Sequence, residues 1–331
     1  MMDFDNAEKV DVNSRLEVMN SLDKSVESVM GSYLNSIETN WQASDLLPLS
    51  SNESFLEEFK EIQEQAKSLS REFLIVLVGD TITEEALPTY QTWLAGVKGF
   101  DQHQNNNWMK WVRNWTAEEN RHGDVLNRYL YLCGRINMRE FEASTQFLIA
   151  AGFDNQAKAD PYMNFVYTSF QESATNISHR RVATLAKKEG NVILSRLCGV
   201  VASDEARHAK AYKAFVSLIF EVDANEMMIA FEKMMRSKIL MPAIALRQLG
   251  SEENVFSEFS VTAQNIGVYT SHDYIDILSS LIKDWQIEKI TGLKAEGEKA
   301  REYLVQLPNR MQKIVERVKV QKSENKLNWI L

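Results

Sequence analysis

The chain has 331 residues, and its 44% hydrophobic and 10% aromatic content is enough apolar material for a sizeable core. A formal net charge of −9 argues against a general binder of nucleic acids or membrane surfaces. No apolar run approaches the length of a transmembrane helix, and the only two cysteines, Cys133 and Cys198, indicate reduced thiols in a cytosol.

The predicted elements are helices, because the chain has only five prolines and thirteen glycines and its strand signals are weak. An amphipathic helix is expected over 12–38 and a charged helix over 53–69. The strongly apolar run 71–98 follows, interrupted by acidic residues. Pro88 lies four residues after Glu84 and cannot donate a hydrogen bond to its carbonyl, so we expect a kink there.

Glycine and proline delimit most of the later helices. Gly134, Gly152 and Gly190 each follow a periodic segment, as helix stops do, and Asp160 with Pro161 is a typical helix start. The helices expected after residue 100 cover 106–133, 138–151, 161–189, 191–220, 224–240, 254–263, 272–289, 294–306 and 308–323. The chain is therefore predicted to be all-α.

Two stretches, 118–122 and 204–208, are near copies that both read acid-Glu-x-Arg-His. A lone glutamate inside an apolar run precedes the glutamate of each copy, by 35 residues in the first case and 33 in the second. Residues three apart on a helix are neighbours on one face, so each Glu-x-x-His presents a carboxylate and an imidazole to one point. The six candidate metal ligands are Glu84, Glu119, His122, Glu172, Glu205 and His208.

A single Glu-x-x-His is more often a solvated pair than a metal site. Here, however, both copies lie in the middle of apolar stripes that should face a core, where unpaired charge is costly. Carboxylates with two imidazoles suit iron or manganese. Two helices that each give Glu, with two that each give Glu-x-x-His, form the inward-facing di-metal site of ferritin-like four-helix bundles.

Five segments of the chain resemble the soluble acyl-[acyl-carrier-protein] desaturases. They are VGD at 78–80, TEEALPTYQT at 83–92, WTAEENRHGD at 115–124, YTSFQE at 167–172 and DEARH at 204–208. The resemblance implies a ferritin-like helical fold, two Fe²⁺ ions per chain and a homodimer. It also implies formation of a cis double bond in a saturated acyl chain on acyl carrier protein, in fatty acid biosynthesis, using O₂ and electrons from reduced ferredoxin.

From this resemblance we expect one domain with a core bundle over about 71–220. Helices within 12–69 and within 224–323 should pack around it. The first forty residues have neither the apolar core of a signal peptide nor the acid-poor character of a transit peptide, so we expect a bacterial, cytoplasmic protein.

The resemblance also assigns expected roles to residues near the metal site. The family's first ligand directly follows a threonine, which selects Glu84 over Glu85. Thr175 could hydrogen-bond to bound oxygen or to its own helix backbone, and neither alternative is favoured over the other. Asp204 could orient a ligating histidine through its second ring nitrogen. Trp115, with Trp41, belongs either to an electron-entry network or to the core.

Two residues depart from the family pattern. Trp93 and Asn164 stand where plant members usually carry smaller residues along the acyl channel, so both are expected to narrow or polarise it. The acyl chain length and double-bond position of the plant members therefore cannot be assigned to this protein. A basic C-terminal stretch is either a carrier-protein dock or, as we slightly favour, an ordinary solvated face. Its residues are Arg310, Lys313, Arg317, Lys319, Lys322 and Lys326.

Two other functions share parts of this pattern. A ribonucleotide reductase small subunit uses the same ligand set, but Leu126 occupies the position of its radical tyrosine. Iron-handling ferritin-like proteins are typically about half this length and would not need the C-terminal helices.

Overall fold

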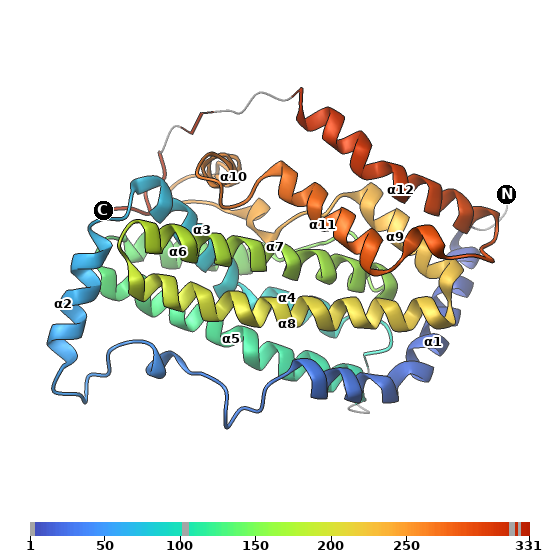
Figure 1. The fold of residues 1–331 in the computed structure, drawn as a ribbon, viewed down its shortest axis with the longest axis horizontal. Helices are drawn as coiled ribbons and strands as arrows, with labels where there is room; N and C mark the ends of the chain where they lie inside the picture. The colour runs from blue at the N-terminus through green and yellow to red at the C-terminus, as the bar shows by residue number, and fades with distance from the viewer. Residues whose placement is uncertain (1–3, 101–105, 318–321, 324–325) are drawn as a thin grey trace.

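The computed structural model describes residues 4–100, 106–317, 322–323 and 326–331. Within these residues the regular structure is helical, apart from two isolated β-bridges (Figure 1). The predicted all-α class is confirmed. No helix of the described part is long and apolar enough to cross a membrane.

Four long helices carry the six candidate ligands. They are α3 (Arg71–Glu85), α5 (Asn107–Cys133), α7 (Pro161–Lys188) and α8 (Val192–Val222). Helices α7 and α8 lie side by side along their length, and α5 packs against both α3 and α8 (Figure 1). Their starts are fixed by side-chain caps, since Ser70, Asn106, Asp160 and Asn191 each accept a backbone N–H of the first turn.

The kink expected after Glu84 is a break between two helices. Helix α3 ends at Glu85, Ala86 lies between, and α4 (Leu87–Ala95) begins with Pro88 in its first turn. Proline is tolerated in a first turn because the N–H groups there have no partner inside the helix. The break places Glu84 in the last turn of α3, whereas Glu172 lies well inside α7.

The other helices surround this core. Helices α1 (Phe4–Tyr33), α2 (Phe55–Ala66) and α6 (Met138–Ala151) pack on it from the N-terminal half. The C-terminal half adds α9 (Ala224–Ser237), α10 (Phe256–Asn265), α11 (Ser271–Asp284) and α12 (Ala295–Val315) (Figure 1). Short 3₁₀ turns lie at Ala43–Asp45, Pro242–Ala245 and Ile287–Lys289.

Most helix bounds match the prediction to within three residues, but three predictions need correction. The helix expected over 272–289 ends at Asp284, because Gln286 adopts a left-handed backbone conformation and a 3₁₀ turn follows at Ile287–Lys289. The helix expected over 12–38 begins earlier and ends at Tyr33. It ends there because other helices bind the following backbone: the Tyr33 carbonyl accepts from Arg207 (2.6 Å), and the Asn35 N–H donates to Glu118 (2.7 Å). These contacts replace the next helical turn.

The prediction of two helices, 294–306 and 308–323, was wrong. A single helix, α12, runs through Pro308 to Val315, and residues 318–321 lie outside the described part. A proline removes one backbone hydrogen bond, here to the Leu304 carbonyl. Leu304 is buried, and Leu307 and Met311 on either side of the proline pack against the core. This packing holds the helix together across the missing bond.

Candidate metal centre

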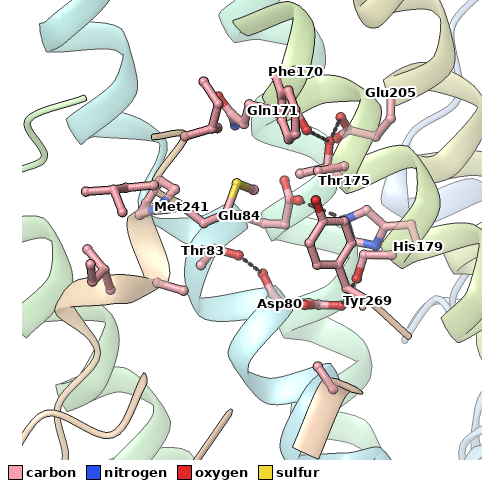
Figure 2. Close-up of a pocket in the computed structure, with 18 of the residues that line it drawn as sticks. Asp80, Thr83, Glu84, Phe170, Gln171, Thr175, His179, Glu205, Met241 and Tyr269 are labelled. Carbon is pink, nitrogen blue, oxygen red and sulfur yellow. Dashed lines mark hydrogen bonds and ion pairs between the residues drawn. The ribbon is translucent and has the colours of Figure 1, made fainter. Parts of the chain in front are cut away.

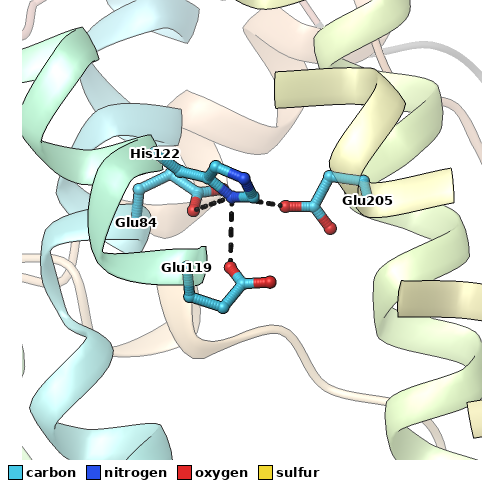
Figure 3. A group of neighbouring side chains, drawn as sticks. All are labelled: Glu84, Glu119, His122 and Glu205. Atoms are coloured by element: carbon cyan, nitrogen blue, oxygen red, sulfur yellow. Dashed lines mark ion pairs between the residues drawn. The ribbon is translucent and has the colours of Figure 1, made fainter. Parts of the chain in front are cut away.

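The structure brings all six candidate ligands together from four helices. Their side-chain donors form two overlapping groups, and the donor atoms within each group lie within 4.8 Å of one another. The first group is Glu84, Glu119, His122 and Glu205 (Figure 3), and the second is Glu119, Glu172, Glu205 and His208. Glu119 and Glu205 belong to both groups, so the two groups lie next to each other and share two carboxylates.

Both histidines turn the same ring nitrogen inward. His122 Nδ1 lies 3.1 Å from Glu205 Oε1, 3.2 Å from Glu119 Oε2 and 3.7 Å from Glu84 Oε2. His208 Nδ1 lies 2.6 Å from Glu119 Oε1 and 3.7 Å from Glu172 Oε2. Both rings are fully buried. The pattern therefore presents two imidazole nitrogens and four carboxylates to one interior space.

An outer ring of charged residues surrounds this cluster, made of Glu118, Arg121, Asp204 and Arg207. Arg121 donates to Asp204 (2.9 Å), and Arg207 donates to Glu118 (2.8 Å). Two acids and two arginines leave the outer ring without net charge. The inner carboxylates must therefore be balanced from within the cluster.

The acids of the outer ring reach across to the opposite repeat. Asp204 lies 3.4 Å from His122 Nε2, and Glu118 lies 2.8 Å from His208 Nε2. The contact to Asp204 is long, whereas that to Glu118 has ordinary hydrogen-bond length. The expectation that Asp204 faces a candidate ligand histidine agrees with this placement. The equivalent contact of Glu118 with His208 was not predicted. The acid and the arginine that both copies of the motif contain could have indicated it.

The pKa values of the four inner carboxyls shift in opposite directions. Burial raises each of them, but the hydrogen bond from His179 and the nearby His122 ring hold the pKa of Glu84 at about 2, and the two cluster histidines lower the pKa of Glu119. Burial together with Glu119 raises the pKa of Glu205. The pKa of Glu172 is raised well above its usual value by burial and by the charges of Glu119 and Glu205.

Several buried atoms at the centre lack hydrogen-bond partners among the described residues. They are Glu119 Oε1, both Glu172 oxygens, His122 Nδ1 and His208 Nδ1. The short distances between some of these atoms have poor hydrogen-bond angles, so proximity does not satisfy them. Buried polar atoms without partners are costly. Oxygen and imidazole donors converging in this way fit a pair of divalent ions such as iron or manganese.

A cavity of about 240 Å³ opens beside the cluster (Figure 2). Three inner carboxylates, Glu84, Glu119 and Glu205, reach its wall, whereas Glu172 and both cluster histidines do not. Helices α3 and α7 line it together with residues 239–244 and α10, and most of its lining surface is apolar. The cavity can therefore hold an apolar chain next to the Glu84 side of the cluster.

Gly79 sets the position of one cavity wall. A Cβ added to this residue would lie 2.2 Å from the ring of Phe259, so the glycine lets α10 pack flush on α3. Phe259 itself lines the cavity. The glycine of the VGD motif thus shapes the space beside the cluster.

Thr175 and Trp115 both reach this cavity. The Thr175 hydroxyl contacts Glu205 and also lies 3.1 Å and 3.2 Å from the backbone carbonyls of Glu172 and Gln171. Trp115 packs edge-on against His208, with ring centroids 6.5 Å apart. Trp41 stacks on His122 at 6.2 Å and donates its indole N–H to Asp204 (3.0 Å).

Trp93 and Asn164 lie together, away from the lining of this cavity. The Trp93 indole N–H donates to Asn164 Oδ1 (2.8 Å), which also accepts from Asn155 (2.8 Å). The Asn164 amide donates to the carbonyls of Asp160 and Lys158. Asn164 is fully buried, and its hydrogen-bonding groups are all used. The pair is therefore a fixed polar link between α4 and α7.

Comparison with known proteins agrees with this architecture. The fatty acid desaturase family model matches residues 14–331. The chain is 46% identical to an acyl-[acyl-carrier-protein] desaturase, chloroplastic, of Cucumis sativus, over 96% of this chain and 81% of that protein. It is also 46% identical to stearoyl-[acyl-carrier-protein] 9-desaturase 1, chloroplastic, of Arabidopsis thaliana, over 96% and 82%. These relatives are plastid proteins, so they lend no support to the expected bacterial location.

A solved structure is similar in fold. It is described as an acyl-ACP desaturase, DesA2, of Mycobacterium tuberculosis H37Rv, and it matches with a TM-score of 0.52 and 19% identity. The match covers 86% of this chain and 99% of that one. The predicted ferritin-like helical fold is confirmed.

Proposed function

The chain belongs to the fatty acid desaturase family, and from this premise we infer that it is an acyl-[acyl-carrier-protein] desaturase of fatty acid biosynthesis. The observation that carries the inference is the buried Glu/His cluster opening onto an apolar cavity. An enzyme that dehydrogenates unactivated methylenes needs both a metal centre for O₂ chemistry and a dry site for the acyl chain. The family match sets the ribonucleotide reductase and iron-handling alternatives aside.

We propose that the cluster holds two iron ions. Glu84, His122 and the shared Glu119 and Glu205 would hold one, and Glu172 and His208 with the same shared pair would hold the other. When bound, the iron pair supplies the oxidising chemistry that, with O₂ and two electrons, removes two hydrogens from neighbouring methylenes. The protein's own part is to balance the charge of the carboxylates, orient the histidines through Asp204 and Glu118, and exclude water.

The cavity would hold the reacting part of the acyl chain. Its apolar residues, among them Leu87, Phe170 and Met241, replace water around the methylenes. Thr175 reaches the same space and contacts Glu205, so we propose that it holds a proton near the site of O₂ chemistry. Electrons from reduced ferredoxin would enter through Trp41, which lies against His122 and Asp204. We propose that Trp115, which packs against His208, is a second residue of this electron path.

Product analysis tests the function. The iron-loaded protein is incubated with reduced ferredoxin, O₂ and stearoyl- or palmitoyl-carrier protein, and the acyl products are identified by mass spectrometry. A cis-monounsaturated product that depends on O₂ and reductant is expected. Absence of unsaturated product over a range of acyl lengths, from a protein that has bound two irons, would contradict the proposal.

Trp93 and Asn164 are proposed to close the far end of the acyl channel. Their 2.8 Å hydrogen bond makes them one unit, so each single change also removes a partner of the other. The double variant Trp93→Met with Asn164→Gly should accept longer acyl chains or shift the double bond. An unchanged product profile across several acyl lengths would refute the assignment.

Carrier-protein docking is proposed to need a local basic patch, because the enzyme carries −9 overall. Arg310 and Lys313 are exposed at the end of α12, and Arg317, Lys322 and Lys326 are exposed beyond it, while Lys319 lies outside the described residues. KM for acyl-carrier protein should rise with salt, since screening acts over about 8 Å at physiological ionic strength. Charge reversal of the first three should raise KM with little change in kcat.

A homodimer is proposed as well. Leu56 of α2, Tyr131 of α5 and Val192 of α8 are large apolar side chains more than half exposed, on helices that pack together. Light scattering of the purified protein should give twice the 38.0 kDa chain mass. A monomeric mass at micromolar concentration would refute this part of the proposal.

A further inference from the structure

Two polar contacts join α7 to α3 at the wall of the cavity. Ser178 donates to Asp80 (2.8 Å), and His179 Nε2 lies 2.8 Å from Glu84 Oε1 (Figure 2). Ser178 and His179 are consecutive on α7, and Asp80 and Glu84 are one turn apart on α3. Only the second contact reaches a residue of the metal cluster.

The His179 ring is held in place by its surroundings. Its side chain is buried, and Cys198 of α8 also hydrogen-bonds to its ring. Glu84 is an acceptor, so the contact places a proton on His179 Nε2. With Oε1 held in this way, the other oxygen, Oε2, faces His122 Nδ1 at 3.7 Å.

Glu172, the counterpart of Glu84 in the second half of the cluster, has no such contact. Neither of its oxygens has a hydrogen-bond partner in the described part of the chain, and His208 Nδ1 is 3.7 Å away. The residue that corresponds to His179, seven positions after Glu84, is Gln91. It lies on α4, beyond the helix break.

We propose that His179 is a positioning residue for Glu84, which makes the metal position of the Glu84 group tighter than that of the Glu172 group. The proposal rests on the two-metal function stated above. Contacts behind a metal ligand fix its orientation before binding, and their loss typically costs about 10–100-fold in metal affinity. Because only one half of the cluster has the contact, the loss must be confined to one metal position.

Titration of the metal-free protein with Co²⁺, followed by calorimetry and visible absorption, tests this directly. Two binding steps are expected. Glu84→Ala and Glu172→Ala, which each remove one ligand of one group, identify which step belongs to which position. His179→Ala should weaken the step that Glu84→Ala abolishes by about tenfold or more and leave the other within about twofold.

Two further variants separate positioning from a general structural role. Ser178→Ala removes the neighbouring contact across the same gap and should leave both steps unchanged. His179→Gln keeps a donor near the place of Nε2 and should restore most of the lost affinity, whereas the shorter His179→Asn should not. This Gln–Asn comparison decides the question even if His179→Ala fails to fold.

The outcomes separate the two proposals. Equal weakening of both steps, unchanged affinities in His179→Ala, or equal behaviour of the Gln and Asn variants would overturn the positioning role. A wild-type protein that binds no metal would overturn the proposed function instead.

Discussion

The two halves of the metal cluster have nearly the same sequence pattern but different surroundings. The Glu84 half lies at the end of a broken helix, touches the cavity and is backed by His179. Glu172 lies inside a continuous helix, does not reach the cavity and has no hydrogen bond on its carboxylate among the described residues. The repeat therefore sets which atoms converge, while residues outside the repeated motifs, such as His179 on α7, decide how each carboxylate is held.

The largest effect, a loss of bound metal, is expected from Glu119, which belongs to both groups. Glu119→Ala removes one of the two carboxylates shared by both groups and should lower the metal content to about one-tenth of the wild-type value or less, because both positions lose a ligand at once. Elemental analysis of the purified variant measures this. Asp124→Asn, a half-exposed carboxylate paired with Arg128 on the same helix, is the matched control. Near-full occupancy in Glu119→Ala would contradict the bridged arrangement.

The next effect separates the halves. Glu84→Ala and Glu172→Ala should each retain about one metal of two, because each residue belongs to only one group. Metal content and desaturation are measured on both, and desaturation should be lost in both, since the O₂ chemistry needs the pair. Glu85→Gln, next to Glu84 but outside the cluster, should keep both metals. Loss of both metals in either single variant would show that the positions are not separable.

A smaller effect tests the crossed outer ring. Asp204→Asn should weaken binding at the position that contains His122, and Glu118→Gln at the position that contains His208, each by about 10–100-fold. Metal titration of the two variants shows which step moves. Because each acid contacts the histidine of the other repeat, the binding step that weakens shows which histidine each acid holds. A reversed assignment of the two steps would contradict the crossed contacts.

The smallest effect concerns the stability of the metal-free protein. Because the pKa of Glu172 is raised in the folded protein, its neutral form stabilises the fold at pH values below the usual pKa of 4.5. This stabilisation is lost as the pH rises through the raised pKa. The lowered pKa of Glu84 has the opposite sign: its contribution is present above 4.5 and is lost as pH falls toward about 2. Glu172→Gln should therefore raise the apoprotein Tm by about 2 °C or more near pH 8, and Glu84→Gln should lower it.

Thermal unfolding of chelator-treated protein between about pH 5 and 8 measures both changes. The two substitutions remove the same charge and the same kind of group, so each is the control for the other. Equal shifts in the same direction would mean that the halves do not differ electrostatically.

The meeting of each glutamate with its histidine could be predicted because helix periodicity decides which residues share a face. The convergence of all six was expected from the ligand pattern of ferritin-like bundles. Glu119 and His122 had to meet on α5, and Glu205 and His208 on α8. The crossed contacts of Glu118 and Asp204 could not be predicted in this way, since they depend on which helices are neighbours. The acid and the arginine in each repeat were nevertheless a visible sign that more than the ligands was repeated.

His179 left no readable signal in the sequence. It lies seven residues after Glu172 and so shares its helix face, but its contact is with Glu84 on another helix. The end of α1 at Tyr33 and the continuation of α12 through Pro308 are similar cases. In each of them a contact between distant segments overrides the local preference.

The last residue of α1 and the segment after it contact the outer ring of charged residues around the cluster. The Asn35 N–H, the Tyr33 carbonyl and the Trp41 indole are partners of Glu118, Arg207 and Asp204. A protease that removed the chain up to Trp41 would leave these buried charges short of partners, at about 1–3 kcal/mol for each lost contact. Trimming this end would therefore loosen Glu118 and Asp204, which hold the two cluster histidines, so the N-terminal segment supports the candidate metal centre.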